Sequence, residues 1–128
     1  NKNTIGISSF ILFMLLDSTN ALIVKRNSYQ KIIFNYDAQD INITNYVVVF
    51  YDGEKYYYDK TLNNSDLTNI VEKMYEVNNF DKPLNSYSSY KLIELQNIAN
   101  KLNIPLINSI GKNKTRQILY SEILEKIA

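Results

Sequence analysis

The residue types in this chain exclude the commonest kinds of catalytic site. Its 128 residues contain no Cys and no His, so the chain cannot build a Cys nucleophile, a Ser-His-Asp triad or a zinc site with Cys and His ligands. It also lacks the glycine motifs that hold phosphates and dinucleotides, since it has three Gly in all. The sequence therefore predicts a chain that is not an enzyme and that holds neither a metal nor a cofactor.

Cationic side chains gather where the last predicted helix begins. They are Lys112, Lys114 and Arg116, and Thr115 between them can cap that helix. Backbone N–H groups at a helix N-terminus, together with nearby cations, favour phosphate groups. We therefore take these four residues as a candidate nucleic-acid-binding site. Such contacts would position the protein on DNA without reading its base sequence.

The net charge of +1 conceals an uneven distribution along the chain. Residues 1–90 carry 8 basic and 10 acidic side chains, whereas residues 91–128 carry 6 basic and 3 acidic ones. Attraction to DNA phosphates thus belongs to the last third and is modest, because strong phosphate binders are usually more basic. The alternative is that these cations are solvated and that the helices form a structural docking module.

Two helices are predicted around the cationic cluster. One extends over about residues 89–102 and ends before Pro105, which disfavours helical geometry in the residue before it. The other extends over about residues 115–127. Each has apolar residues on one face at helical spacing. They are Leu92, Leu95, Ile98, Ala99 and Leu102 in the first helix, and Ile118, Leu119, Ile123 and Ile127 in the second.

One pattern joins these helices: an apolar helix, a small loop with Gly and Lys, and a second helix that begins at Thr. Its residues are Leu92-Ile93-Glu94-Leu95, Ile98-Ala99, Leu102-Asn103-Ile104, Gly111-Lys112-Asn113-Lys114-Thr115, Leu119 and Ile123. The pattern resembles the SAP family and its helix-extended loop-helix and Rho N-terminal-like relatives, in the form common in nucleocytoplasmic large DNA virus proteins. The resemblance covers about 38 residues and implies DNA binding through the loop. The loop from Ile104 to Gly111 is longer and more apolar than a minimal SAP loop.

The overall composition indicates the kind of source. Asn (18), Ile (17), Lys (12) and Tyr (11) dominate, and these are the residues with the most A/T-rich codons. The bias favours an A/T-rich genome such as that of a large amoebal virus, a protist parasite or a low-GC bacterium. We expect a location in a virion or in host cytoplasm. The chain begins at Asn1 rather than at Met, so we expect it to be a fragment of a longer polypeptide.

The strongest local signal in the first half is a β-hairpin at Asp52-Gly53. The β-rich runs 46–51 and 54–60 flank this pair, which suits a two-residue type I′ turn because both central residues then need positive φ. In that register Tyr51 faces Glu54, and each valine of the first run faces a tyrosine of the second. Two further strand candidates are residues 21–26 and 29–36.

Helices are predicted on both sides of these strands. The apolar run 5–16, capped by Ser8 or Ser9, is too short to span a membrane and reads as a buried helix. Asn64 or Ser65 caps a second helix, which ends near residue 78. Its apolar stripe is formed by Leu67, Ile70, Val71 and Met74.

The second strand of the hairpin ends in Tyr57-Tyr58-Asp59. With the preceding order of helix and strands, it resembles the end of an ovarian-tumour-type (OTU) cysteine protease, in which a His precedes an aromatic residue near a strand end. The resemblance implies an inactive domain, since Tyr57 stands in place of the His and the chain has no Cys. Tyr56, Tyr57 and Tyr58 form a possible interaction surface; the alternative is ordinary cross-strand packing.

These features predict an α+β fold: a small sheet with antiparallel strands and packed helices, followed by a C-terminal helix-loop-helix. We expect an α/β part over residues 1–80, a linker over 81–89 and a SAP-like module over 90–128. The expected function is that of a non-catalytic binding module of a larger viral protein, which contacts DNA weakly and has no membrane partner. The alternatives are a protein–protein assembly domain of a virion, or a fragment of an enzyme whose catalytic residues lie outside this chain.

Overall fold

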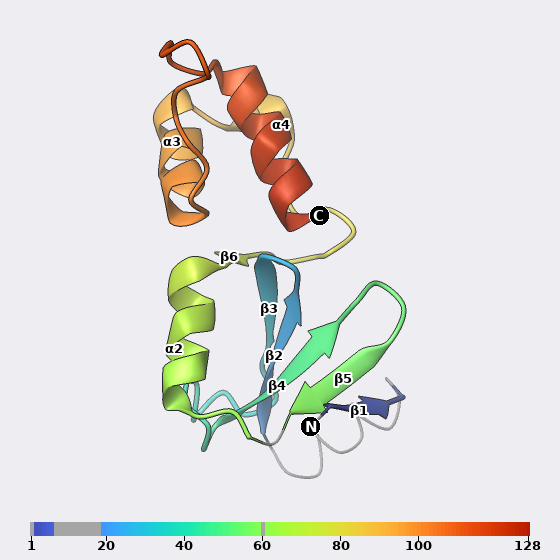
Figure 1. Cartoon of the computed structure of the whole chain (residues 1–128). Coiled ribbons are helices and arrows are strands. Elements are labelled where there is room, and N and C mark those ends of the chain that lie inside the picture. Colours follow the sequence, from blue (N-terminus) through green and yellow to red (C-terminus); the bar gives the residue numbers. More distant parts are fainter. Residues whose placement is uncertain (1, 7–18, 60) are drawn as a thin grey trace.

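The chain folds into a mixed β-sheet with helices packed on it and beyond it, which confirms the predicted α+β class. The computed structural model describes residues 2–6, 19–59 and 61–128. Within these ranges the sheet has the strand order β1-β5-β4-β2-β3-β6 (Figure 1). The strands are β1 (Lys2–Ile5), β2 (Asn20–Lys25), β3 (Ser28–Ile32), β4 (Tyr46–Tyr51), β5 (Tyr56–Asp59) and β6 (Tyr75–Glu76). The helices are α2 (Asn64–Lys73), the 3-10 helix η1 (Tyr87–Ser89), α3 (Leu92–Lys101) and α4 (Arg116–Ile127).

The predicted helix with a cap at Ser8 or Ser9 lies outside the described residues. Among those that are described, no helix has the length and apolar character needed to cross a membrane.

The centre of the sheet is a parallel pair that joins two antiparallel hairpins. β2 pairs with β3, β4 pairs with β5, and β2 runs parallel to β4. The segment between β3 and β4 makes this possible, because it crosses the end of the sheet where β3 ends and β2 begins, and β4 starts at that same end on the other side of β2. The buried side chain of Asn20 holds that segment: it accepts from the backbone N–H groups of Phe34 and Asn35 and donates to the carbonyl of Ala38 (2.8, 2.8 and 2.7 Å).

The hairpin of β4 and β5 forms where predicted, but its predicted two-residue turn is wrong. Tyr51 faces Tyr56, so the loop has four residues, Asp52–Lys55. The Asp52 carboxylate accepts from the backbone N–H groups of Glu54 and Lys55 (2.8 and 2.7 Å), which closes the longer loop. Only Gly53 has a positive φ there (97°), whereas a type I′ turn needs two such residues. The two-residue shift leaves every side chain on its predicted face.

Helix α2 is capped one residue before the earlier of its two predicted caps. Asn63 is the N-cap: its side chain accepts from the backbone N–H of Asp66, and the Asp66 carboxylate accepts from the N–H of Asn63 in return. The prediction that Asn64 or Ser65 would cap this helix is therefore wrong. The helix also ends earlier than predicted, at Lys73, and the chain then forms the short strand β6.

Helix α2 covers one face of the sheet with its predicted apolar stripe. Leu67 and Ile70 are buried against Leu22, Val24 and Val48 of the central strands. On the opposite face a smaller cluster contains Ala21, Ile23 and Val49. Both faces of β2 are thus buried, which explains why its sequence is a continuous apolar run rather than an alternating pattern.

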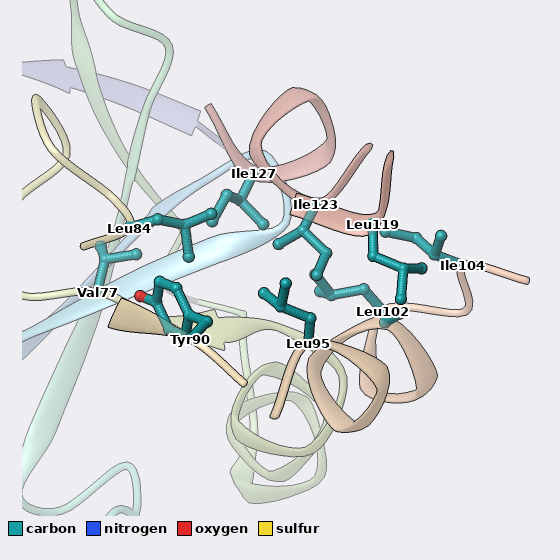
Figure 2. Packing of buried hydrophobic residues seen from close by; sticks show 10 residues of the cluster. Val77, Leu84, Tyr90, Leu95, Leu102, Ile104, Leu119, Ile123 and Ile127 are labelled. Carbon is teal, nitrogen blue, oxygen red and sulfur yellow. The ribbon is translucent and has the colours of Figure 1, made fainter. Parts of the chain in front are cut away.

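The two C-terminal helices have a core of their own (Figure 2). Leu95 and Ala99 of α3 meet Leu119 and Ile123 of α4, and all four side chains are fully buried. The segment predicted as a linker, residues 81–89, contributes the buried Leu84 to this core. The sequence prediction of an apolar face on each helix is confirmed at these positions. It is wrong for Leu92 and Ile118, which are 43% and 46% exposed.

The turn between β2 and β3 binds the C-terminal end of α4. The last carbonyls of a helix have no partner within it. Here the side chains of the two turn residues and of the first residue of β3 supply partners. The helix pair is thus attached to the sheet by polar contacts as well as by its apolar core. The bonds join Arg26 to Ala128 (3.0 Å), Asn27 to Lys126 (3.0 Å) and Ser28 to Ile127 (3.2 Å).

Candidate binding surface of the C-terminal helices

Thr115 caps α4 as predicted. Its Oγ1 accepts from the backbone N–H of Ile118 at 3.3 Å, which satisfies one donor of the first helical turn. The candidate nucleic-acid site therefore lies at a helix N-terminus, as the sequence indicated. The side chains around it have roles that the sequence did not indicate.

Lys114 is held in an internal ion pair. Its Nζ lies 2.8 and 3.2 Å from the two carboxylate oxygens of Glu122, two turns along α4. The Lys114 side chain is only 11% exposed. A phosphate would have to displace Glu122 to contact this ammonium directly, so Lys114 is a structural residue of the helix start.

Arg116 packs on the aromatic residues that precede α3. Its guanidinium lies 4.5 Å from the centre of the Tyr87 ring, and Nε donates to the Tyr87 hydroxyl at 3.2 Å. Nη1 donates to the backbone carbonyl of Tyr90 at 3.1 Å. Stacking and fork-like donation are the geometry that arginine favours. Arg116 thus ties α4 to the segment before α3.

Lys112 differs from the other two cations. Its residue is exposed, and its ammonium makes no ion pair or hydrogen bond with the part of the chain that the structure describes. Of the three cations predicted to contact phosphate, it alone is available without a change of structure.

Lys112 lies on a tight loop between the helices. Ile107 and Asn113 form a β-bridge at its base, and the backbone N–H of Asn108 donates to the carbonyl of Lys112 at 2.8 Å. The Asn108 side chain accepts from the N–H groups of Ile110 and Lys112, both at 3.0 Å. These bonds fix the conformation of the loop before any partner binds.

Apolar side chains are exposed on this loop and on the helices beside it, a feature that the sequence prediction missed. Ile110 at the loop tip is 73% exposed, and Ile107 at its base is 52% exposed. Ile93 on α3 is 58% exposed and Ile118 on α4 is 46% exposed. The sequence signal was present in the loop from Ile104 to Gly111, which is more apolar than a solvated loop requires.

The three tyrosines of β5 do not form one surface. Successive residues of a strand point to opposite faces, so Tyr57 lies on the α2 side of the sheet and Tyr56 and Tyr58 lie on the other. Tyr56 stacks on Tyr51, with ring centres 4.5 Å apart. Burial raises the pKa of Tyr56 above 10.0. The cross-strand packing that was the alternative for these residues fits this geometry.

No family model, curated protein or solved structure matches this chain. Over the described ranges, no group of three or more Asp and Glu side chains could hold a metal ion. The SAP-like and OTU-like resemblances therefore stay predictions.

Proposed function

We propose that this chain is a non-catalytic protein-binding module, which contacts its partner through the end of the helix pair where both α3 and α4 begin. The exposed apolar side chains carry this proposal. Of the eight large apolar or aromatic side chains exposed in the described ranges, six lie between residues 87 and 118. Apolar side chains concentrated on one exposed region are typical of protein–protein contact sites.

The fixed conformation of the loop supports the same function. A surface loop that had only to connect two helices would gain nothing from holding an isoleucine at its tip in solvent. The bonds made by Asn108 order the loop in advance, so binding would cost little further conformational entropy. This argument fits the assembly role in a virion that the sequence left open, and it includes no catalytic step.

Contact with DNA phosphates is the second candidate, and one observation favours it. Residues 95–121 contain no Asp or Glu but four basic residues, of which Lys101 and Lys112 are exposed. This region therefore faces solvent with positive charge. Contact with DNA is the second candidate, and not the first, because the side chains of Lys114 and Arg116 are bonded within the protein.

Site-specific photocrosslinking tests the protein-binding proposal. A benzophenone amino acid replaces Ile110 in one variant and Asn97, an exposed residue on α3, in the matched control. In a lysate of cells that express the full-length protein, position 110 should form a discrete protein adduct that position 97 does not form. Equal labelling from both positions would contradict the proposal.

The DNA candidate has a separate test. Fluorescence anisotropy with a short random-sequence duplex at low salt measures the affinity of the parent chain and of Lys112→Ala. Binding that falls in the variant and with added salt would support phosphate contact, because each released counterion contributes to the salt dependence. No binding by the parent chain at low salt would exclude it.

A further inference from the structure

Two surfaces of this chain share apolar exposure but differ in charge. The first, here called the basic surface, consists of Ile107, Ile110, Ile118 and Lys112 at the loop end of the helix pair. Its neighbours in the sequence, residues 95–121, contain no acidic residue. An apolar tip beside an exposed lysine is complementary to an apolar hollow with negative charge at its edge.

The second surface contains an apolar hollow with acidic residues near it. A shallow cavity of about 180 Å³ lies between α2 and the segment before β4, lined by Ile41, Thr68, Val71 and Glu72. The same segment carries the other two exposed large side chains, Tyr36 (75%) and Ile43 (50%). These residues, with the exposed Asp37 and Asp40, are here called the acidic surface.

The charge of the acidic surface mirrors that of the basic one. Residues 32–54 contain four acidic residues and no Lys or Arg. Across the chain, all eight exposed large apolar or aromatic side chains of the described ranges lie either between residues 36 and 43 or between 87 and 118. Tyr36 and Ile43 lie within the stretch that has no Lys or Arg, and Ile107, Ile110 and Ile118 lie within the stretch that has no Asp or Glu.

The two surfaces lie too far apart to meet within one molecule. Figure 1 shows the loop between α3 and α4 at one end of the molecule and the segment between β3 and β4 at the other. The sheet and α2 separate them, and the contacts between the β2–β3 turn and α4 fix the two parts together. The complementary surfaces can therefore meet only between two copies of the chain.

We propose that this chain associates head to tail, with Ile110 of one copy in the cavity beside Val71 of the next and with Lys112 facing Glu72. This inference rests on the proposed protein-binding function and names a second copy of the chain as the partner. A contact of this type joins different surfaces, so each copy keeps one free surface of each kind, and association continues into longer assemblies or closes into a ring.

Sedimentation equilibrium of the purified chain, from micromolar to millimolar concentration, tests the inference. The weight-average mass should rise above the 14.9 kDa of one chain as concentration increases. Ile110→Asp removes the apolar anchor and should hold the mass at that of a monomer. Added salt should weaken the association, because the facing charges lie near solvent.

A charge exchange identifies the pair of surfaces. Lys112→Glu and Glu72→Lys each place like charges opposite one another, and each should raise the dissociation constant about tenfold. The double variant Lys112→Glu/Glu72→Lys restores opposite charges between copies and should recover association. Lys82→Glu makes the same charge change at an exposed position outside both surfaces, so it should behave like the parent. Circular dichroism confirms that each variant is folded.

Three results would overturn the inference: a parent chain that stays monomeric at every concentration, single variants that associate like the parent, or a double variant that does not recover. They are distinguishable from failure of the proposed function. If position 110 crosslinks to a different protein while the purified chain is monomeric, head-to-tail association is wrong and the protein-binding function stands. If position 110 labels no better than position 97, both fail.

Discussion

At the residue scale, residue type alone did not show whether a charged side chain serves a partner or the fold. Lys112 and Lys114 are two residues apart in the same cationic cluster, yet one is exposed and the other is held by Glu122 with a side chain 11% exposed. The difference depends on a carboxylate eight residues further along α4. The number of cations in a sequence cluster is thus the largest number that can contact a nucleic acid, and the fold decides how many of them do.

The Lys114–Glu122 pair leads to a stability prediction. Glu122→Ala would leave the Lys114 ammonium nearly buried without its carboxylate, so we expect the free energy of unfolding to fall by about 1 kcal/mol. Urea denaturation followed by circular dichroism measures this change. Glu125→Ala, on the exposed face of the same helix, is the control and should change stability much less. Equal effects of the two substitutions would show that the ion pair contributes nothing.

The raised pKa values of two tyrosines, Tyr29 and Tyr75, lead to a prediction of how stability changes at alkaline pH. Burial and the nearby Glu76 carboxylate raise the pKa of Tyr29 from 10.0 to about 12, and burial and Tyr90 raise that of Tyr75 to about 12. Between these pH values the unfolded chain loses tyrosine protons that the folded chain keeps, so their stabilising contribution is complete below pH 10 and is lost as pH rises towards 12.

Urea denaturation at a series of pH values from 8 to 12 checks this alkaline loss. Tyr75→Phe removes one of the two titrating groups, and its stability should fall less steeply than that of the parent over the same range. Tyr36→Phe, an exposed tyrosine, is the control and should leave the slope unchanged. A parent chain whose stability is constant up to pH 12 would contradict the prediction.

At the scale of elements, side-chain bonds to the backbone changed details that periodicity cannot resolve. The Asp52 carboxylate selects a four-residue loop over the two-residue turn that Asp-Gly favours, and its bonds from the N–H groups of Lys55 and Glu54 hold its pKa below 3.8. Asn63 likewise takes the cap of α2 because its side chain and that of Asp66 satisfy each other's backbone N–H groups. Asn63 and Asn64 are adjacent and of the same type, so the sequence alone does not decide which of them caps α2.

The corrected register can be tested with paired cysteines, since the chain has no Cys of its own. Tyr51→Cys/Tyr56→Cys places two thiols at directly opposite positions, which suits a disulfide. Tyr51→Cys/Glu54→Cys would be opposite only in the two-residue turn. On mild oxidation, mass spectrometry should find the disulfide in the first variant in far higher yield. A higher yield in the second variant would show that the register predicted from a two-residue turn is correct.

At the scale of the whole molecule, the helix pair is attached to the sheet through a few polar groups. The side chain of Ser28 is fully buried, and its hydroxyl lies near the carbonyls of Lys25 and Ile127 at 2.9 and 3.2 Å. A buried acceptor that loses its donor is costly. The bond to Ile127 joins residues 99 positions apart in the sequence, and no local pattern indicates it.

Loss of this attachment should loosen the end of α4. We expect Ser28→Ala to lower the free energy of unfolding by about 1–2 kcal/mol, because it removes the one buried hydroxyl that donates to the carbonyls of Lys25 and Ile127. Hydrogen exchange of the last turn of α4 should become faster, while exchange in α3 changes less. Ser88→Ala, at an exposed position, is the control. Unchanged exchange at the end of α4 would show that the apolar core alone holds the helix pair in place.

The sequence by itself determined the class of the fold, the places of β2–β5, α2, α3 and α4, and the impossibility of a Cys- or His-based active site. These depend on residue type and on periodicity along the chain, which are local properties. The tertiary structure decided the parallel pairing of β2 with β4, the docking of the helix pair on the β2–β3 turn, and the exposure of each cation and isoleucine. These depend on contacts between residues far apart in the chain. Lys112 stayed a candidate for binding, and Ile110 became one, because the fold gives neither side chain a partner within the described residues.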